Sequence, residues 1–148
     1  MPLIRDYIAE HERVINHGGA AVRALDRGDH AQAQAEAALM YDELRPHWEG
    51  EETGLFAVMM SEEIFAEHIT PLIAEHRELA AFLDTVDLTV AADQERFRAE
   101  FDELYDHIAK EEDGLFPASL TSLDGESWDS AIAAWHRAHP DREMIPDS

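Results

Sequence analysis

Residues 41–58 read YDELRPHWEGEETGLFAV, and residues 101–118 read FDELYDHIAKEEDGLFPA. The two stretches lie 60 positions apart and share nine of their 18 residues. A second match has an offset of 65, because the residues IAEH occur at 8–11 and again at 73–76. A period of this length indicates one supersecondary unit that is used twice. We therefore expect two helical hairpins of the same design.

Apolar residues follow a helical period through most of the chain. Between residues 3 and 25 they recur at the i, i+3, i+4, i+7 spacing of one buried helix face. We expect further helices at about 30–60, 70–84 and 92–120, with a separate short turn of helix at 61–69. Four long amphipathic helices joined by short turns predict an all-α, up-down-up-down four-helix bundle.

Two further features are expected of this bundle, a kink in its second helix and an additional segment at its C-terminal end. The second helix contains Pro46, Gly50 and Gly54, so we expect a kink or local loosening there. After Gly125 a short additional C-terminal helix is expected, followed by a loosely ordered tail from His139. Residues 1–122 are therefore interpreted as the bundle, and residues 123–148 as a short C-terminal helix and tail packed on the bundle or on a partner.

Composition excludes several classes of function. The chain of 148 residues, one domain in length, has 11 Lys and Arg against 33 Asp and Glu, a net charge of −22. This balance disfavours binding to nucleic acid or to an anionic membrane surface. The absence of cysteine excludes disulfides, thiol catalysis and iron–sulfur clusters. No apolar run approaches the roughly 20 residues of a membrane span, and no signal-peptide pattern is present, so we expect a cytoplasmic protein.

The repeat singles out four of the nine histidines. His47 and Glu51 are four residues apart, as are His107 and Glu111, so each pair lies on one helix face with a rise of about 6 Å between its members. His11 and the histidine of the second IAEH segment stand on apolar faces of the other two helices. Burying all six groups without a metal would leave polar groups unpaired at roughly 1–3 kcal/mol each. We therefore predict a metal site formed by His11, His47, Glu51, His76, His107 and Glu111.

This ordered pattern, with Glu-Glu and Leu-Phe following each pair, resembles the haemerythrin-like, or HHE cation-binding, domain over roughly residues 3–120. The resemblance implies a non-haem di-iron centre in the bundle core, with two iron ions per chain joined by an oxo or hydroxo bridge. It also implies that the four histidines are terminal ligands and that Glu51 and Glu111 are the bridging carboxylates.

One position departs from the oxygen-carrying haemerythrins, which have a fifth histidine one turn before the residue that matches His76. Leu72 stands there, and its counterpart in the first hairpin is Tyr7. Two octahedral ions need about 12 ligand positions, of which about two then remain open. This favours chemistry with water, peroxide or nitric oxide over simple reversible oxygen binding. Tyr7 either ligates iron, donates a hydrogen bond to an oxygen bound there, or is an ordinary core tyrosine.

The neighbouring residues have alternative interpretations. The acidic residues beside the motifs either hold ligand imidazoles or lie in solvent, and with 33 acids we expect solvent for Glu52 and Glu112 and leave Glu10 and Glu75 open. The two Leu-Phe pairs at 55–56 and 115–116 predict an apolar wall beside the metals. Among the other histidines, His68 is a weaker ligand candidate, and surface positions are expected for His17, His30, His136 and His139.

Three functions are compatible with this site. The first is a di-iron binding protein that handles a small ligand, namely O2, NO or H2O2, and this is the broad prediction. The second is a di-iron peroxidase or catalase-like enzyme that consumes hydrogen peroxide. The third is an iron or oxygen sensor, which the lack of a DNA-binding element disfavours. Whether the protein is an enzyme stays open at this point, and a homodimer is a possible assembly.

Overall fold

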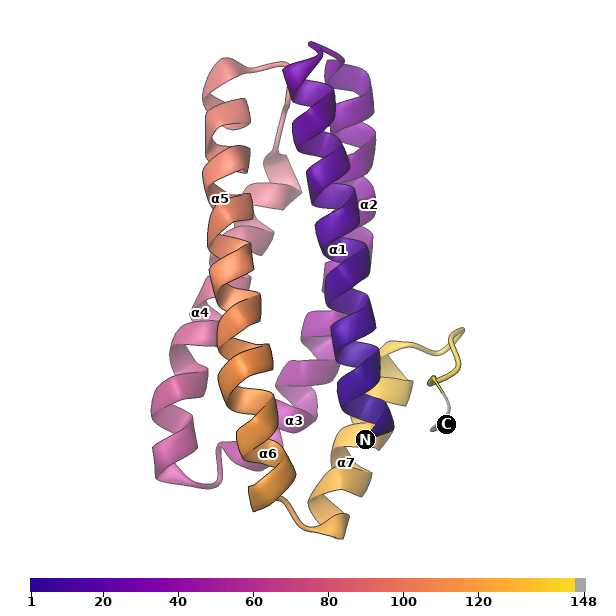
Figure 1. Cartoon of the computed structure of the whole chain (residues 1–148), viewed down its shortest axis with the longest axis vertical. Helices are drawn as coiled ribbons and strands as arrows, with labels where there is room; N and C mark the ends of the chain where they lie inside the picture. Colours follow the sequence, from indigo (N-terminus) through magenta and orange to yellow (C-terminus); the bar gives the residue numbers. More distant parts are fainter. Residues whose placement is uncertain (146–148) are drawn as a thin grey trace.

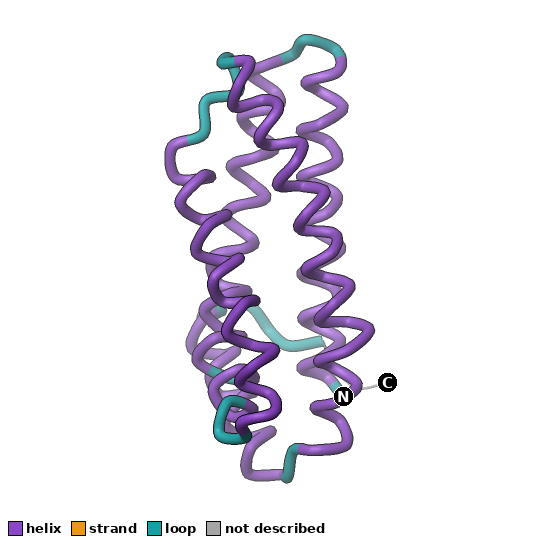
Figure 2. Tube along the Cα trace, turned by 90° about the vertical axis from the view of Figure 1, so that its left-hand side faces the viewer, coloured by secondary structure: helices purple, strands orange, loops and turns teal. Residues whose placement is uncertain are grey.

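The computed structural model describes residues 1–145, and every regular element in that range is a helix (Figure 1). Each of two hairpins consists of two long helices, α1 (Pro2–Asp26) with α2 (His30–Thr53) and α4 (Glu63–Thr85) with α5 (Ala91–Lys110). Figure 2 shows the long helices running along the molecule with most loops gathered at its two ends. The predicted all-α bundle is thus confirmed. None of the helices within residues 1–145 has the length and apolar composition needed to cross a membrane.

The second helix of each hairpin changes its course near the repeated Glu-Glu, after it in the first hairpin and at it in the second. Gly54 separates α2 from a short helix, α3 (Leu55–Met59), so the predicted helix at 30–60 is two helices. Pro46 is accommodated inside α2, and the interruption falls at the glycine. In the second hairpin α5 passes into a π-helix, η1 (Glu111–Leu115), and then into α6 (Phe116–Ser122).

The predicted break before Thr70-Pro71 is wrong. Residues 63–85 form the single helix α4 with Pro71 inside it, so the stretch 61–69 is no separate turn. Pro71 and Glu67 are both exposed, so the Glu67 carbonyl that lacks its helical N–H partner lies on the solvent side of the helix. Nearby, the Thr70 hydroxyl donates to the Ala66 carbonyl at 2.9 Å. A proline on an exposed face therefore does not have to end this helix.

The core consists of two apolar clusters with a polar layer between them. Val14, Leu44, Leu79 and Leu104 belong to one cluster, which fills the bundle on the side of the 26–30 turn. The other cluster fills the opposite end, and its buried members include Leu3, Phe56, Leu72, Phe116 and Trp135. Along each long helix, the predicted ligand residues lie between these clusters. The Leu-Phe pairs at 55–56 and 115–116 form part of the second cluster, as the predicted apolar wall requires.

The C-terminal helix α7 (Gly125–Ala138) packs on α2 and α3 beside the start of α1 (Figure 1). Asp124 caps it by accepting a hydrogen bond from the backbone N–H of Ser127 at 2.8 Å. Residues 139–145 have no regular structure, yet they are held to the bundle. The Arg142 guanidinium contacts Glu43 at 3.2 Å, and the Ile145 N–H donates to Asp6 at 2.9 Å. The predicted loose tail also includes residues 146–148, which lie outside the described residues.

Candidate metal centre

Four helices bring the six predicted ligand residues into one buried layer. His11 comes from α1, His47 and Glu51 from α2, His76 from α4 and His107 from α5, while Glu111 is the first residue of η1. All six side chains are buried, and both glutamates are completely inaccessible. The repeat therefore places these residues together as the sequence predicts. Their role as metal ligands stays a prediction.

The imidazoles meet in two pairs through their Nε2 atoms. The Nε2 atoms of His11 and His47 lie 3.1 Å apart, and those of His76 and His107 lie 2.9 Å apart. Two nitrogen ligands at right angles on one metal, with bonds near 2.0–2.1 Å, are separated by about 3 Å. Each pair thus has the spacing of two neighbouring ligands on a single ion.

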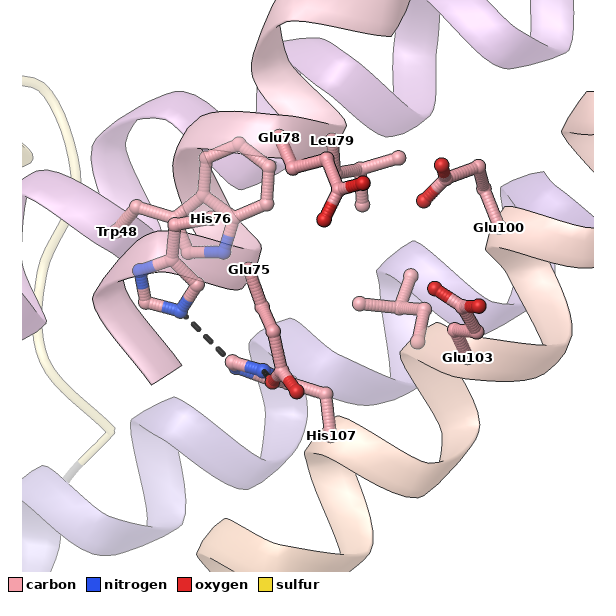
Figure 3. A pocket seen from close by; sticks show the side chains of 9 residues that line it. Trp48, Glu75, His76, Glu78, Leu79, Glu100, Glu103 and His107 are labelled. Carbon is pink, nitrogen blue, oxygen red and sulfur yellow. Dashed lines mark hydrogen bonds and ion pairs between the residues drawn. The ribbon is translucent and has the colours of Figure 1, made fainter. Parts of the chain in front are cut away.

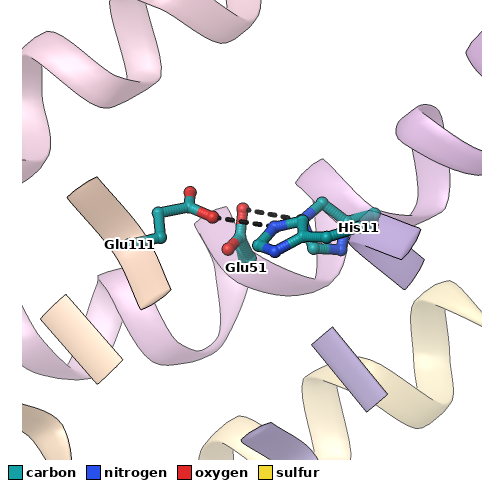
Figure 4. A group of neighbouring side chains, drawn as sticks. His11, Glu51 and Glu111 are labelled. Carbon is teal, nitrogen blue, oxygen red and sulfur yellow. Dashed lines mark hydrogen bonds and ion pairs between the residues drawn. The ribbon is translucent and has the colours of Figure 1, made fainter. Parts of the chain in front are cut away.

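The two glutamates lie between these pairs, and Figure 4 shows Glu51 and Glu111 directed toward His11. Glu111 extends Oε2 to 3.0 Å from Nε2 of His11 and Oε1 to 3.0 Å from Nε2 of His107. Glu51 Oε1 lies 3.3 Å from Nε2 of His47 and 3.7 Å from Nε2 of His76. Both carboxylates therefore reach both histidine pairs, which is the placement that a bridging ligand needs.

The donor atoms divide into two overlapping groups. Those of His11, His47, Glu51 and Glu111 lie within 4.8 Å of one another, and so do those of His76, His107 and Glu111. Glu111 belongs to both groups. The arrangement accordingly offers two adjacent cation positions that share a carboxylate.

An outer set of carboxylates faces the opposite ring nitrogens and follows the internal repeat. Glu112 contacts Nδ1 of His11 at 2.8 Å, and its counterpart Glu52 contacts Nδ1 of His76 at 3.0 Å. The other pair of counterparts is Glu75, at 2.6 Å from Nδ1 of His107, and Glu10, at 3.6 Å from Nδ1 of His47. The expectation that Glu52 and Glu112 lie free in solvent is therefore wrong.

These outer contacts fix the direction in which the imidazoles can donate. A carboxylate only accepts hydrogen bonds, so the Nδ1 atoms of His11, His76 and His107 carry the hydrogen, and the Nε2 lone pairs point inward. Both oxygens of Glu51 lie in the same layer without a hydrogen-bond donor among the described residues. Inward lone pairs and a buried carboxylate without a hydrogen-bond donor are stabilised by a nearby cation. The residues present therefore fit a bound cation.

The electrostatics of the side chains agree with this need for positive charge. Burial lowers the pKa of His107, but Glu111 and Glu75 outweigh it and raise that pKa to about 9. Burial is likewise outweighed at His11 and His47, where neighbouring carboxylates raise the pKa. Burial and the neighbouring Glu111 raise the pKa of Glu51. The carboxylates around these imidazoles therefore stabilise positive charge in the layer.

A comparison with known families identifies the domain. The model of the haemerythrin HHE cation-binding domain matches residues 3–119, which include all six residues of the central layer. The chain belongs to the haemerythrin HHE family. A search of curated proteins and a search of solved structures each found no match. In this haemerythrin-family chain the match ends before α7 begins, so the C-terminal helix lies outside the family domain.

Tyr7 and Leu72 lie on the same side of the polar layer, in the second apolar cluster. Tyr7 is fully buried, its ring is 5.5 Å from that of His47, and its hydroxyl has no hydrogen-bond partner among the described residues. Burial and then the nearby carboxylate of Glu51 raise its pKa well above the usual value. Leu72 is buried one turn before His76 and provides no ligand atom.

The remaining histidines lie outside the central layer. His136 is exposed, His17 and His30 are half-buried, and His68 is exposed on α4. His139 contradicts its predicted surface position, because it is buried against Trp135 and Glu10. Sequence reasoning missed this residue because it has no repeat partner and its contact Glu10 lies at the other end of the chain.

A cleft between α4 and α5 lies beside His76 and His107 (Figure 3). The carboxylates of Glu78, Glu100 and Glu103 gather around it. Burial and the nearby charges of Glu103 and Glu78 raise the pKa of Glu100. This side of the haemerythrin-family site is therefore strongly acidic.

Proposed function

We propose that the chain binds two iron ions in the central layer and handles a small ligand there, with hydrogen peroxide as the ligand we favour over O2 and NO. The observation that carries the proposal is the pair of adjacent donor groups that share Glu111. Their donors are imidazole nitrogens and carboxylate oxygens without sulfur, a set that suits iron or manganese. Bound iron would supply redox chemistry toward such ligands.

The protein's own contribution is to hold the donors in place. The carboxylates of Glu52, Glu75 and Glu112 orient their imidazoles, and such partners also raise the basicity of metal-ligating histidines. Glu51 and Glu111 reach both histidine pairs. The two apolar clusters, one on each side of the layer, keep bulk water away from it.

The opening beside Leu72 supports a role in binding a small ligand. A pocket of about 530 Å³ lies between α4 and the α5–η1–α6 segment, and Leu72 and Leu115 line its inner side. Leu72 has no atom that can fill a ligand position at the His76–His107 pair. A small uncharged molecule such as hydrogen peroxide suits this largely apolar pocket better than an anion does, because the chain carries a net charge of −22.

Metal analysis and ligand chemistry test the proposal together. We expect about two irons per chain after growth with ample iron, near-ultraviolet absorption of a bridged ferric pair, and oxygen release on addition of peroxide. One zinc per chain under the same conditions would contradict the iron assignment. Reversible oxygen binding that lasts for hours, with no reaction toward peroxide, would instead support an oxygen carrier.

A further inference from the structure

The outer contact of His47 differs from the other three. The outer carboxylates of His11, His76 and His107 lie at 2.8, 3.0 and 2.6 Å from the ring nitrogen, within hydrogen-bond distance. Glu10 lies 3.6 Å from Nδ1 of His47, and that nitrogen has no hydrogen bond among the described residues. The repeat predicts equal contacts for Glu10 and Glu75, so something draws Glu10 away.

Residues after the family domain contact both oxygens of Glu10. The indole N–H of Trp135 on α7 donates to Oε2 at 3.1 Å. Nε2 of His139 lies 2.6 Å from Oε1, in an ion-pair contact rather than a well-aligned hydrogen bond. Nδ1 of His139 also lies 2.9 Å from the Trp135 carbonyl oxygen, so each of its ring nitrogens faces an oxygen atom.

The close approach of α7 makes these contacts possible. A Cβ atom at Gly54 would lie 2.6 Å from the Gly50 carbonyl oxygen and 2.9 Å from Cβ of Ala134. A Cβ atom at the repeat counterpart, Gly114, would meet nothing within 4 Å. The backbone of α7 thus rests on glycines in the first hairpin, while the equivalent place in the second hairpin borders the open pocket beside Leu72.

The segment that follows α7 keeps His139 in this position. The ring of His139 stacks on that of Trp135 with 4.3 Å between centroids. Arg142 pairs with Glu43 on α2, and the N–H of Ile145 bonds Asp6 on α1. The result is an enclosed carboxylate. Glu10 is completely buried, whereas the side chains of Glu112, Glu52 and Glu75 are 29, 20 and 40% exposed.

We propose that Trp135 and His139 are positioning residues that hold Glu10 back from His47 and so make the two metal positions chemically different. A shorter contact with a carboxylate makes a histidine a stronger ligand. His47 has the longest such contact, so Glu10 strengthens the position formed by His11 and His47 less than Glu75 strengthens the position formed by His76 and His107. This inference rests on the proposed two-metal site, but it concerns the unequal strength of the two positions and not their existence.

Cobalt(II) binding to the metal-free full chain tests the inference. We expect two equivalents with clearly different affinities. His139→Leu frees Oε1 of Glu10 to approach His47, so the affinity of the His11–His47 position should rise about tenfold while that of the His76–His107 position stays unchanged. His139→Gln keeps an N–H donor for Glu10 and should retain the wild-type difference.

Glu75→Gln is the matched control, because Glu75 is the repeat counterpart of Glu10. This variant should weaken the His76–His107 position and leave the His11–His47 position unchanged. In proton NMR spectra of the cobalt-loaded chain, His139→Leu should shift the exchangeable Nδ1–H signal of His47 and leave those of the other three ligand histidines in place.

Three outcomes decide the result. Two bound cobalt ions with affinities that His139→Leu leaves unchanged, or changes equally, would overturn the inference alone. Fewer than two bound ions in the wild-type chain would contradict the proposed function itself. If His139→Leu does not fold, as judged by circular dichroism, Trp135→Phe removes the indole donor while keeping an aromatic ring. The affinity of the His11–His47 position must then rise for the inference to stand.

Discussion

Oε2 of Glu112 lies 2.8 Å from Nδ1 of His11, although 101 residues separate the two along the chain. Glu52 repeats this relationship with His76 at 3.0 Å. The contacts cross between hairpins in both cases, so each hairpin orients a histidine of the other. Neither half of the repeat can therefore complete the site alone.

Leu72→His should shift the reactivity of the site from peroxide breakdown toward oxygen binding. The new imidazole stands four residues before His76 on the same helix face and can fill a position that leucine leaves open. We expect peroxide breakdown to slow several-fold and oxygen binding to last longer, measured by oxygen release and by optical spectra. Leu72→Ile, which adds no ligand atom, should behave like the wild-type chain. Unchanged peroxide breakdown in Leu72→His would show that the residue at position 72 does not affect the reaction.

Tyr7→Phe separates the roles left open for Tyr7. The hydroxyl is buried without a partner among residues 1–145, so its removal should stabilise the metal-free chain by about 1 kcal/mol or more. Iron content should stay near two per chain if the hydroxyl only donates to a bound ligand. Loss of a visible absorption band on substitution would instead identify Tyr7 as a ligand. Metal analysis, denaturant unfolding and visible spectra provide the three measurements.

Glu51→Leu should have opposite effects on metal binding and on metal-free stability. Glu51 is fully buried and neither oxygen has a hydrogen bond, so an apolar replacement should stabilise the metal-free chain by about 1–3 kcal/mol. Metal content should fall below two ions per chain, because a shared carboxylate is lost. Glu49→Leu, at an exposed position of the same helix, should change neither quantity appreciably. A destabilised metal-free Glu51→Leu chain would show that the carboxylate is not a strained group.

Two alanine substitutions at repeat-equivalent glycines should differ in sign. Gly54→Ala places Cβ against the Gly50 carbonyl and Ala134, and should destabilise the chain by about 1–3 kcal/mol. Gly114→Ala meets open space within a helix and should stabilise it by roughly 0.5–1 kcal/mol. Thermal and urea unfolding measure both values. Equal effects would show that α7 does not pack closely on Gly54 in solution.

Acid should weaken the attachment of the segment after α7. Burial raises the pKa of Glu43, but Arg142 and Arg13 outweigh it and hold that pKa below the ordinary value of 4.5. The stabilisation is therefore complete above pH 4.5 and is lost as the pH falls through the lower folded-state value. Urea unfolding of the metal-free chain should show a steeper loss of stability below pH 4.5 in the wild type than in Glu43→Gln. Parallel pH profiles would mean that this ion pair contributes nothing measurable.

The sequence predicts the bundle and the central layer well because both rest on periodicity. Helical spacing places His47 and Glu51 on one face, and the 60-residue repeat gives the matching pair in the second hairpin. The continuity of α4 through Pro71 could not be predicted in this way. It depends on which face of the helix is exposed, and the sequence pattern around Thr70-Pro71 resembles a helix start.

The role of His139 could not be predicted for a different reason. Its partners Glu10 and Trp135 meet only after α7 folds back onto α1 and α2, and no repeat or spacing signals that approach. The outer glutamates are an intermediate case. Their positions beside the ligand motifs favour contact with the imidazoles, but an excess of 33 acidic residues conceals that signal until the contacts are seen.

The polar layer between the two apolar clusters has a consequence for local unfolding. In the metal-free chain the ends of the bundle keep their apolar packing, while the middle of each long helix surrounds buried polar atoms that lack hydrogen bonds among the described residues. Amide hydrogens near Glu51 and Glu111 should then exchange with solvent faster than those at the two ends, the reverse of a bundle that frays from its termini. Metal binding would then slow amide exchange first at the centre of the bundle.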